Sequence, residues 1–123
     1  QKSHAAAFVA NQALLSSSLY IQEHFKKNIA IETLCHISQL PIRQYQRKFK
    51  CLFGASPQEY IIRHRIYFAC EALRNTQHTI AKIGMDAGFY DQSSFTRQFK
   101  KYMNTTPLKY RKELVSNGVT SPQ

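Results

Sequence analysis

Apolar residues recur along this chain at every third or fourth position, which is the spacing of α-helices, and no segment alternates like a strand. The pattern predicts an all-α fold of about seven helices. The first helix is expected over residues 5–27, or over 14–27 if residues 1–13 form an alanine-rich lead-in or linker. The others are expected near residues 31–38, 42–53, 57–74, 80–87, 92–103 and 107–115, followed by a flexible C-terminal tail at 116–123.

Several residues at the expected helix ends have the chemistry of helix caps. Ser56 and Glu59 have the spacing of a capping box at the start of the middle helix. Thr79 and Asp91 can cap the two helices that follow them, and Gly88 can end a helix in the left-handed conformation. These signals support the helix starts independently of the apolar pattern.

Apolar stripes predict the buried faces of several helices, and on the helix near 42–53 the stripe consists of Ile42, Tyr45, Phe49, Leu52 and Phe53. On the first helix the stripe consists of Leu15, Leu19, Ile21 and Phe25. On the middle helix it consists of Ile61, Ile62, Ile66, Ala69, Cys70 and Leu73.

The second half of the chain repeats the first at an offset of 50 residues. The residues Arg47, Phe49, Lys50, Pro57 and Tyr60 recur as Arg97, Phe99, Lys100, Pro107 and Tyr110. Each copy is a short helix, a tight turn and a longer helix, which predicts helix-turn-helix motifs near 31–54 and 80–103. The helix between them, at roughly 18 residues, is about 27 Å long. That length is compatible with the ~34 Å between successive major-groove faces of one side of DNA.

The longer helix of each copy carries a polar face without any acidic residue. The face of the first consists of Arg43, Gln46, Arg47 and Lys50, and that of the second of Ser93, Thr96, Arg97 and Lys100. Arginine can bond to guanine and glutamine to adenine, and threonine offers a methyl group to thymine. The two lysines are better placed for phosphates. The alternative is that both are ordinary solvated faces, but the register that the two helices share favours base reading. The aromatic pairs Phe49/Phe99 and Tyr60/Tyr110 are expected in the core and not as platforms for stacked bases.

The charge of the chain favours a polyanionic partner. Seventeen Lys and Arg residues against seven Asp and Glu residues give a formal net charge of +10. The basic residues cluster at 41–54 and 97–112, where no acid occurs. RNA or a membrane surface would also suit this charge. No apolar run approaches transmembrane length, so a soluble chain is expected, and the expected partners include no membrane.

The cysteines give no sign of a metal site, a cofactor or catalysis. Cys35, Cys51 and Cys70 are odd in number and widely spaced, and they form no ligand pattern with the histidines. Three reduced thiols in a cytoplasmic protein are expected. The sequence shows no nucleophile with a base, no phosphate loop and no paired carboxylates, so we do not expect an enzyme.

The second half, from IAKIGMDAGFYDQSSF to the PLKYR run at residues 107–111, resembles the AraC/XylS family of bacterial transcriptional regulators. The first half matches through Leu34, Phe49-Lys50, Ser56-Pro57 and Tyr60. The resemblance covers residues 14–112 and implies a two-lobed DNA-binding domain that places two recognition helices in adjacent major-groove segments. The base-reading residues that it implies are Arg43, Gln46, Arg47, Gln92, Ser93, Thr96 and Arg97.

The resemblance also implies partners. Proteins of this kind usually activate transcription by contacting RNA polymerase, and many carry a separate N-terminal effector-binding or dimerisation domain. Because the chain begins at Gln1, we expect it to be a fragment that lacks such a domain. The polar faces differ at Arg43/Ser93 and Gln46/Thr96, which predicts an asymmetric double-stranded DNA site.

Several positions depart from the family pattern. Pro41 stands where a serine is usual and Gln39 where a glycine is usual, which affects the turn before the first recognition helix. Gly84 replaces an alanine, at a cost of about 1 kcal/mol in helix propensity. Asn104 replaces a glycine, and Asn tolerates the left-handed conformation.

Two other functions compete with sequence-specific DNA binding. A non-specific architectural protein is disfavoured because Gln46, Ser93 and Thr96 add hydrogen-bonding groups where phosphate binding would prefer lysine. A protein-interaction module that uses residues 1–13 or the middle helix is compatible with DNA binding.

Overall fold

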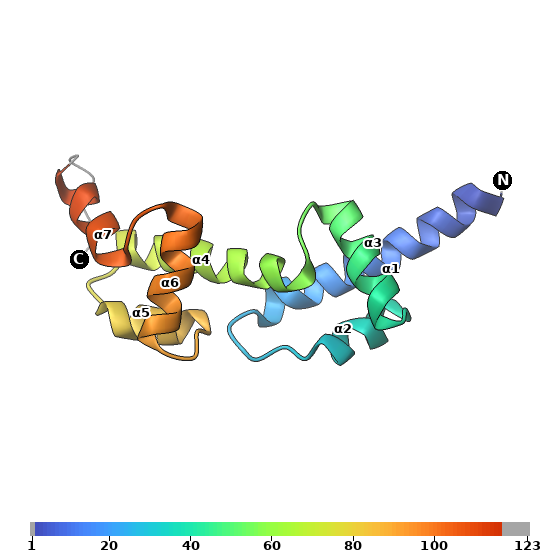
Figure 1. Ribbon diagram of the computed structural model, residues 1–123, viewed down its shortest axis with the longest axis horizontal. Coiled ribbons are helices and arrows are strands. Elements are labelled where there is room, and N and C mark those ends of the chain that lie inside the picture. Colours follow the sequence, from blue (N-terminus) through green and yellow to red (C-terminus); the bar gives the residue numbers. More distant parts are fainter. Residues whose placement is uncertain (1, 117–123) are drawn as a thin grey trace. The chain divides into compact units, whose positions relative to one another are not determined.

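The computed structural model describes residues 2–116, with side chains from Ala5 onward, and the regular secondary structure of this part is all α-helix, joined by short connecting segments (Figure 1). Its helices are α1 (Lys2–His24), α2 (Ile31–Ser38), α3 (Ile42–Phe53), α4 (Pro57–Asn75), α5 (Ile80–Ala87), α6 (Gln92–Met103) and α7 (Pro107–Ser116). The predicted all-α fold of seven helices is therefore confirmed.

The helix bounds differ from the expected ones mainly at the ends of the chain. α1 is one continuous helix from Lys2 to His24, so it ends three residues before the expected residue 27, and the alternative that started the helix at residue 14 is wrong. α4 and α7 each extend one residue beyond the expected end. In the predicted tail, Ser116 is the last residue of α7, and 117–123 lie outside the described residues.

The chain forms two compact units, residues 1–61 and 62–123, and each has its own hydrophobic core. The core of the first unit contains Leu14, Ile21, Leu34, Tyr45, Phe49 and Ile61. The core of the second contains Ile66, Ala69, Cys70, Leu73, Ile83, Ala87, Phe89, Phe95 and Phe99.

Helix α4 belongs to both units, and its two parts have different counterparts in the repeat. Its first residues repeat the start of α7, because Pro57 and Tyr60 match Pro107 and Tyr110. Its later part repeats α1 instead. The buried positions Leu14, Ser17, Ser18 and Ile21 of α1 recur 52 residues later as Ile66, Ala69, Cys70 and Leu73. One helix therefore ends the first unit and begins the second.

The buried face predicted for the first helix is correct only in part: Ile21 is fully buried and Phe25, just after α1, packs against the core. Leu15 and Leu19 are 43% and 55% exposed, whereas Ser17 and Ser18 are buried. The Ser17 hydroxyl donates to the Leu14 carbonyl (2.8 Å) and accepts a hydrogen bond from the Tyr45 hydroxyl (3.0 Å). Because its hydrogen bonds are made within the helix and the core, the small hydroxyl is buried without leaving an unsatisfied group.

The buried face predicted for α4 is confirmed. Its stripe residues Ile61, Ile66, Ala69, Cys70 and Leu73 are buried, and Ile62 is partly buried against the core of the second unit.

The predicted caps are also confirmed. The Ser56 amide donates to the Glu59 carboxylate (3.0 Å), and the Glu59 amide donates to the Ser56 hydroxyl (3.1 Å), which is the reciprocal capping box. Thr79 accepts from the Lys82 amide (3.1 Å). 

The cap of the second recognition helix and the end of α5 follow the prediction as well. Asp91 accepts a hydrogen bond from the Ser94 amide (2.8 Å), and Gly88 has φ +109° at the end of α5.

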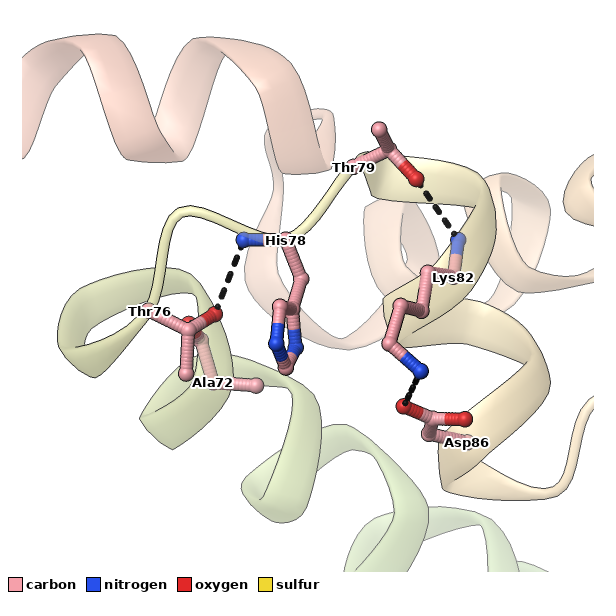
Figure 2. Close-up of polar contacts among 6 residues, drawn as sticks. All are labelled: Ala72, Thr76, His78, Thr79, Lys82 and Asp86. Carbon is pink, nitrogen blue, oxygen red and sulfur yellow. Dashed lines mark hydrogen bonds and ion pairs between the residues drawn. The ribbon is translucent and has the colours of Figure 1, made fainter.

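The segment between α4 and α5 is held by local polar contacts. Figure 2 shows that Thr76 accepts from the His78 amide (3.2 Å), and that Lys82 pairs with Asp86 across one turn of α5 (3.2 Å). Thr76 also donates to the Ala72 carbonyl (2.7 Å). The hydrogen bonds of Thr76 connect the start of this segment to α4, and the Lys82–Asp86 pair lies within α5.

Arg111 of α7 also forms hydrogen bonds to this segment and to the end of α4. Its guanidinium donates to the backbone carbonyls of Leu73 (3.2 Å), Thr76 (3.2 Å) and His78 (2.7 Å). The equivalent position of the first unit is Ile61, which packs into the core instead. This position therefore contributes hydrogen bonds in the second unit and apolar packing in the first.

The turn of the first helix-turn-helix keeps the geometry of the second despite its unusual residue. Gln39 has φ +58°, and the Leu40 amide bonds to the Cys35 carbonyl (3.2 Å). The second turn has the equivalent bond, from the Phe89 amide to the Gly84 carbonyl (3.0 Å). Both are Schellman-type helix ends, so Gln39 preserves the turn in a conformation that glycine would adopt with less strain.

Gly84 has a packing role that the sequence does not reveal. A Cβ at this position would lie 2.7 Å from Cδ2 and 2.9 Å from Cγ of Phe95, whose ring is fully buried. The absence of a side chain therefore lets α5 approach the aromatic core of α6 closely. This reverses the expectation from helix propensity alone.

We predict that Gly84→Ala destabilises the protein by about 1–3 kcal/mol, because the new methyl overpacks against Phe95. Denaturant unfolding measures this. Ala81→Gly, at an exposed position of the same helix, is the control and costs up to about 1 kcal/mol through propensity. A rise in stability of Gly84→Ala would show that propensity outweighs packing.

We predict that Arg111→Lys lowers the free energy of unfolding by about 1–3 kcal/mol, because an ammonium group cannot reach three separate carbonyls. Lys112→Met, at the exposed neighbouring position, should change it by at most about 0.5 kcal/mol. Equal melting temperatures for the two variants would rule out a stabilising role for the Arg111 hydrogen bonds.

Candidate nucleic-acid interface

Each longer helix of the two motifs is anchored by aromatic rings on one side. In α3, Tyr45 and Phe49 are fully buried, and the Phe49 ring meets Tyr60 edge-on at 5.2 Å between centroids. In α6, the Phe99 ring meets Tyr110 in the same way at 5.5 Å. Phe49 and Phe99 lie in the cores, as predicted, and Tyr60 and Tyr110 are partly buried against them.

The anchored face of α3 is narrower than the sequence suggested. Ile42 and Leu52, the ends of its apolar pattern, are 46% and 41% exposed, and Phe53 is partly buried. The core contacts of α3 therefore come from Tyr45, Phe49 and Phe53, whereas Ile42 and Leu52 reach solvent.

The residues predicted to read DNA lie on the opposite faces. All four on α3 are exposed, namely Arg43, Gln46, Arg47 and Lys50. On α6, Gln92, Ser93, Arg97 and Lys100 are exposed and Thr96 is half-buried. The structure thus presents every predicted residue at the surface of its own unit.

The first unit has a hollow of about 450 Å³ beside α3. Gln46, Arg47 and Lys50 line it together, and Arg43 lies outside it. Apolar residues of α2 and of the segment before it form part of the wall. Three of the four predicted residues are therefore gathered around one concave surface.

Ser56 and Gln58 also line this hollow, and sequence reasoning missed them as site residues. They stand at the start of α4, where the capping box already engages the Ser56 and Glu59 amides, so the start of the helix contributes side chains to this hollow. A signal was available in the sequence, because a proline follows each longer helix at the same distance, as Pro57 and Pro107.

The second unit has a matching hollow of about 480 Å³ on α6. Its lining residues are Gln92, Ser93, Thr96 and Arg97, which are the four predicted base readers of this helix. Lys100 lies one turn further along and is not part of the lining.

The electrostatics of both faces are positive. Neither α3 nor α6 contains an acidic residue. Among the described residues, no carboxylate pairs with the side chains of Arg43, Arg47, Lys50, Arg97 or Lys100. These cations therefore remain available to an anionic partner.

The three cysteines are free thiols, and burial raises the pKa of Cys35 and Cys70 above the ordinary value. A raised pKa leaves a thiol protonated and a poor nucleophile at neutral pH. Within residues 5–116, no three His, Cys, Asp or Glu side chains gather as a metal site would require. None of the described helices is long and apolar enough to cross a membrane.

Comparison with known proteins places this geometry in a family. The family model of a helix-turn-helix domain matches residues 34–113. The probable transcription factor PqrA of Proteus vulgaris is 34% identical over 94 residues, which cover 75% of this chain and 77% of PqrA.

A longer relative and a solved structure agree with this match. The transcriptional activator RhaS of Salmonella schwarzengrund is 29% identical over 102 residues, which cover 82% of this chain but 37% of RhaS. The chain spans about a third of the length of several relatives that it matches. The DNA-binding domain of AdpA, solved in complex with a target DNA, shares the fold with a TM-score of 0.79 at 21% identity, covering 85% of this chain and 94% of that one.

The family is one of transcription regulators and not of enzymes, in agreement with the sequence. With both helix-turn-helix motifs, their exposed basic faces and the match over most of its length, the chain belongs to the AraC/XylS family and is a DNA-binding domain of that kind.

Proposed function

We propose that this domain reads an asymmetric double-stranded DNA site in the major groove with α3 and α6, and that it activates transcription. The observation that carries the proposal is the exposed, acid-free face on both helices, opposite the duplicated aromatic anchors. Pure phosphate binding would need only cations, but these faces also offer amide and hydroxyl groups.

The roles of the residues follow from their chemistry and place. Arg47 and Arg97 fork onto guanine, Gln46 pairs with adenine, and Thr96 contacts a thymine methyl. Lys50 and Lys100 bind phosphates. Gln92 and Ser93, in the first turn of α6, add hydrogen bonds to base edges, and Arg43 does so from the first turn of α3.

The side chain of Gln58 lies beside Arg47 and Lys50 at the same hollow and donates a hydrogen bond to a DNA phosphate. A phosphate bound there would fix the register of α3 in the groove, because such contacts position a protein without reading sequence.

The wider biological role is part of the same proposal. RhaS is named a transcriptional activator, and this chain spans only 37% of it, so we propose an effector-binding or dimerisation domain elsewhere in the whole protein. RNA polymerase is the proposed protein partner, and the cytoplasm is the proposed compartment. No cofactor is part of the proposal.

We predict that Arg47→Ala costs about 1–3 kcal/mol in binding to the preferred sequence and relaxes selectivity at one base pair. Lys50→Ala should weaken binding to all sequences alike and reduce the salt slope by about 1. Titrations of preferred and random duplexes at several salt concentrations measure both effects. An equal loss on both duplexes for Arg47→Ala would exclude a base-reading role.

We predict that selection from a random DNA pool returns two unlike sequence blocks about one helical turn, roughly 10 base pairs, apart. The double variant Ser93→Arg, Thr96→Gln copies the face of α3 onto α6, so it should return two similar blocks. A wild-type pool without enrichment would refute sequence-specific reading. If the second block is unchanged in the double variant, residues 93 and 96 do not read the sequence.

A further inference from the structure

The second unit contains a cavity of about 420 Å³ that DNA reading does not use. Its walls are largely apolar and aromatic. They are formed by Ile66, Tyr67, Cys70, Tyr102, Met103 and Tyr110, with charged residues at 63, 71 and 74. A volume of this size falls within the range of small-molecule sites.

The repeat suggests why the second unit has this cavity. In the first unit, Phe53 ends α3, and its ring packs 4.4 Å from Phe49 and 5.5 Å from Tyr60. The equivalent residue of α6 is Met103, an unbranched side chain, and the cavity lies between it and Tyr110, the counterpart of Tyr60. A flexible thioether adapts its shape to a guest better than a ring does.

The charged residues of the cavity leave one positive charge without a partner. Glu71 pairs with Arg74 and also accepts from the Asn75 amide group (3.1 Å). Arg63 is exposed and makes no ion pair or hydrogen bond with the described residues. The cavity thus combines an apolar body with one available guanidinium group.

Other polar groups in the wall do not add charge. Burial raises the pKa of the Cys70 thiol and of the Tyr110 hydroxyl, so both are neutral near pH 7. The thiol and the hydroxyl also interact with each other. A cation would meet Arg63 and Arg74, whereas an anion with an apolar body would meet both features of the cavity favourably.

We propose that this cavity binds a small apolar carboxylic acid, with its hydrocarbon body between Met103 and the tyrosines and its carboxylate on Arg63. Tyr102 and Met103 lie five and six residues beyond Arg97, so Tyr102 projects about 140° away from it around α6. The ligand therefore occupies a different side of α6 from the residues proposed to read DNA.

The chain has only two methionines, which allows a site-specific test. With ¹³C-methyl methionine, we expect 4-phenylbutyrate to shift the Met103 methyl signal saturably and to leave Met85, which is 59% exposed on α5, unmoved. The isosteric alcohol 4-phenylbutanol should bind about two- to fivefold more weakly, as expected for one exposed ion pair. Shifts of both signals alike, no saturation, or equal affinity of the alcohol would overturn the proposal.

Variants test the site by calorimetry. Met103→Phe copies the first unit and should fill the cavity and abolish binding, while Met85→Phe should leave the affinity unchanged. Arg63→Gln should lower the affinity for the acid to that for the alcohol, whereas Lys48→Gln, which removes the same charge from the first unit, should not. Full affinity in Met103→Phe or in Arg63→Gln would refute the site. These measurements contain no DNA, so they stand or fall independently of the proposed function.

Discussion

The edge-on contact between a phenylalanine of each longer helix and a tyrosine of the helix that follows determines the rest of this structure. Phe49 meets Tyr60, and Phe99 meets Tyr110, with nearly the same centroid distance. The contact fixes the rotation of α3 and α6 about their own axes, and the opposite face is then exposed. Aromatic pairs of this geometry contribute about 0.5–1.5 kcal/mol beyond their burial. Each unit therefore presents its polar face on the side of the helix opposite its own core, although the two faces differ in sequence.

The two units keep this contact and differ around it. Ile61 packs into the core of the first unit, whereas its equivalent in the second unit, Arg111, bonds to three carbonyls. Phe53 packs against aromatic rings in the first unit, whereas its equivalent, Met103, lines a cavity in the second. Both differences lie at positions outside the polar faces of α3 and α6. The two copies therefore keep the aromatic contact and differ in the residues around it, where the cavity of the second unit lies.

Most of the fold could be predicted from the sequence because its helix ends are encoded locally. The capping box of Ser56 and Glu59 depends on residues three apart, and so do the other confirmed caps. The buried face of α1 could not be predicted, because Ser17 is satisfied partly by Tyr45, 28 residues away. The role of Gly84 also depends on a ring from another helix. The faces of α3 and α6 were predictable from helical spacing, but the hollow beside Gln58 required the tertiary fold.

Helix α4 has a consequence for how the protein unfolds. Ile61 and Ile62 are consecutive residues, yet they pack in the cores of different units. If one unit melts, the part of α4 that packs in its core loses those contacts. A helix is costly to nucleate and inexpensive to extend, so an intact turn on one side lowers the cost of ordering the next. An ordered part of α4 in one unit therefore lowers the free-energy cost of extending the helix into the other, which favours cooperative folding of the two units.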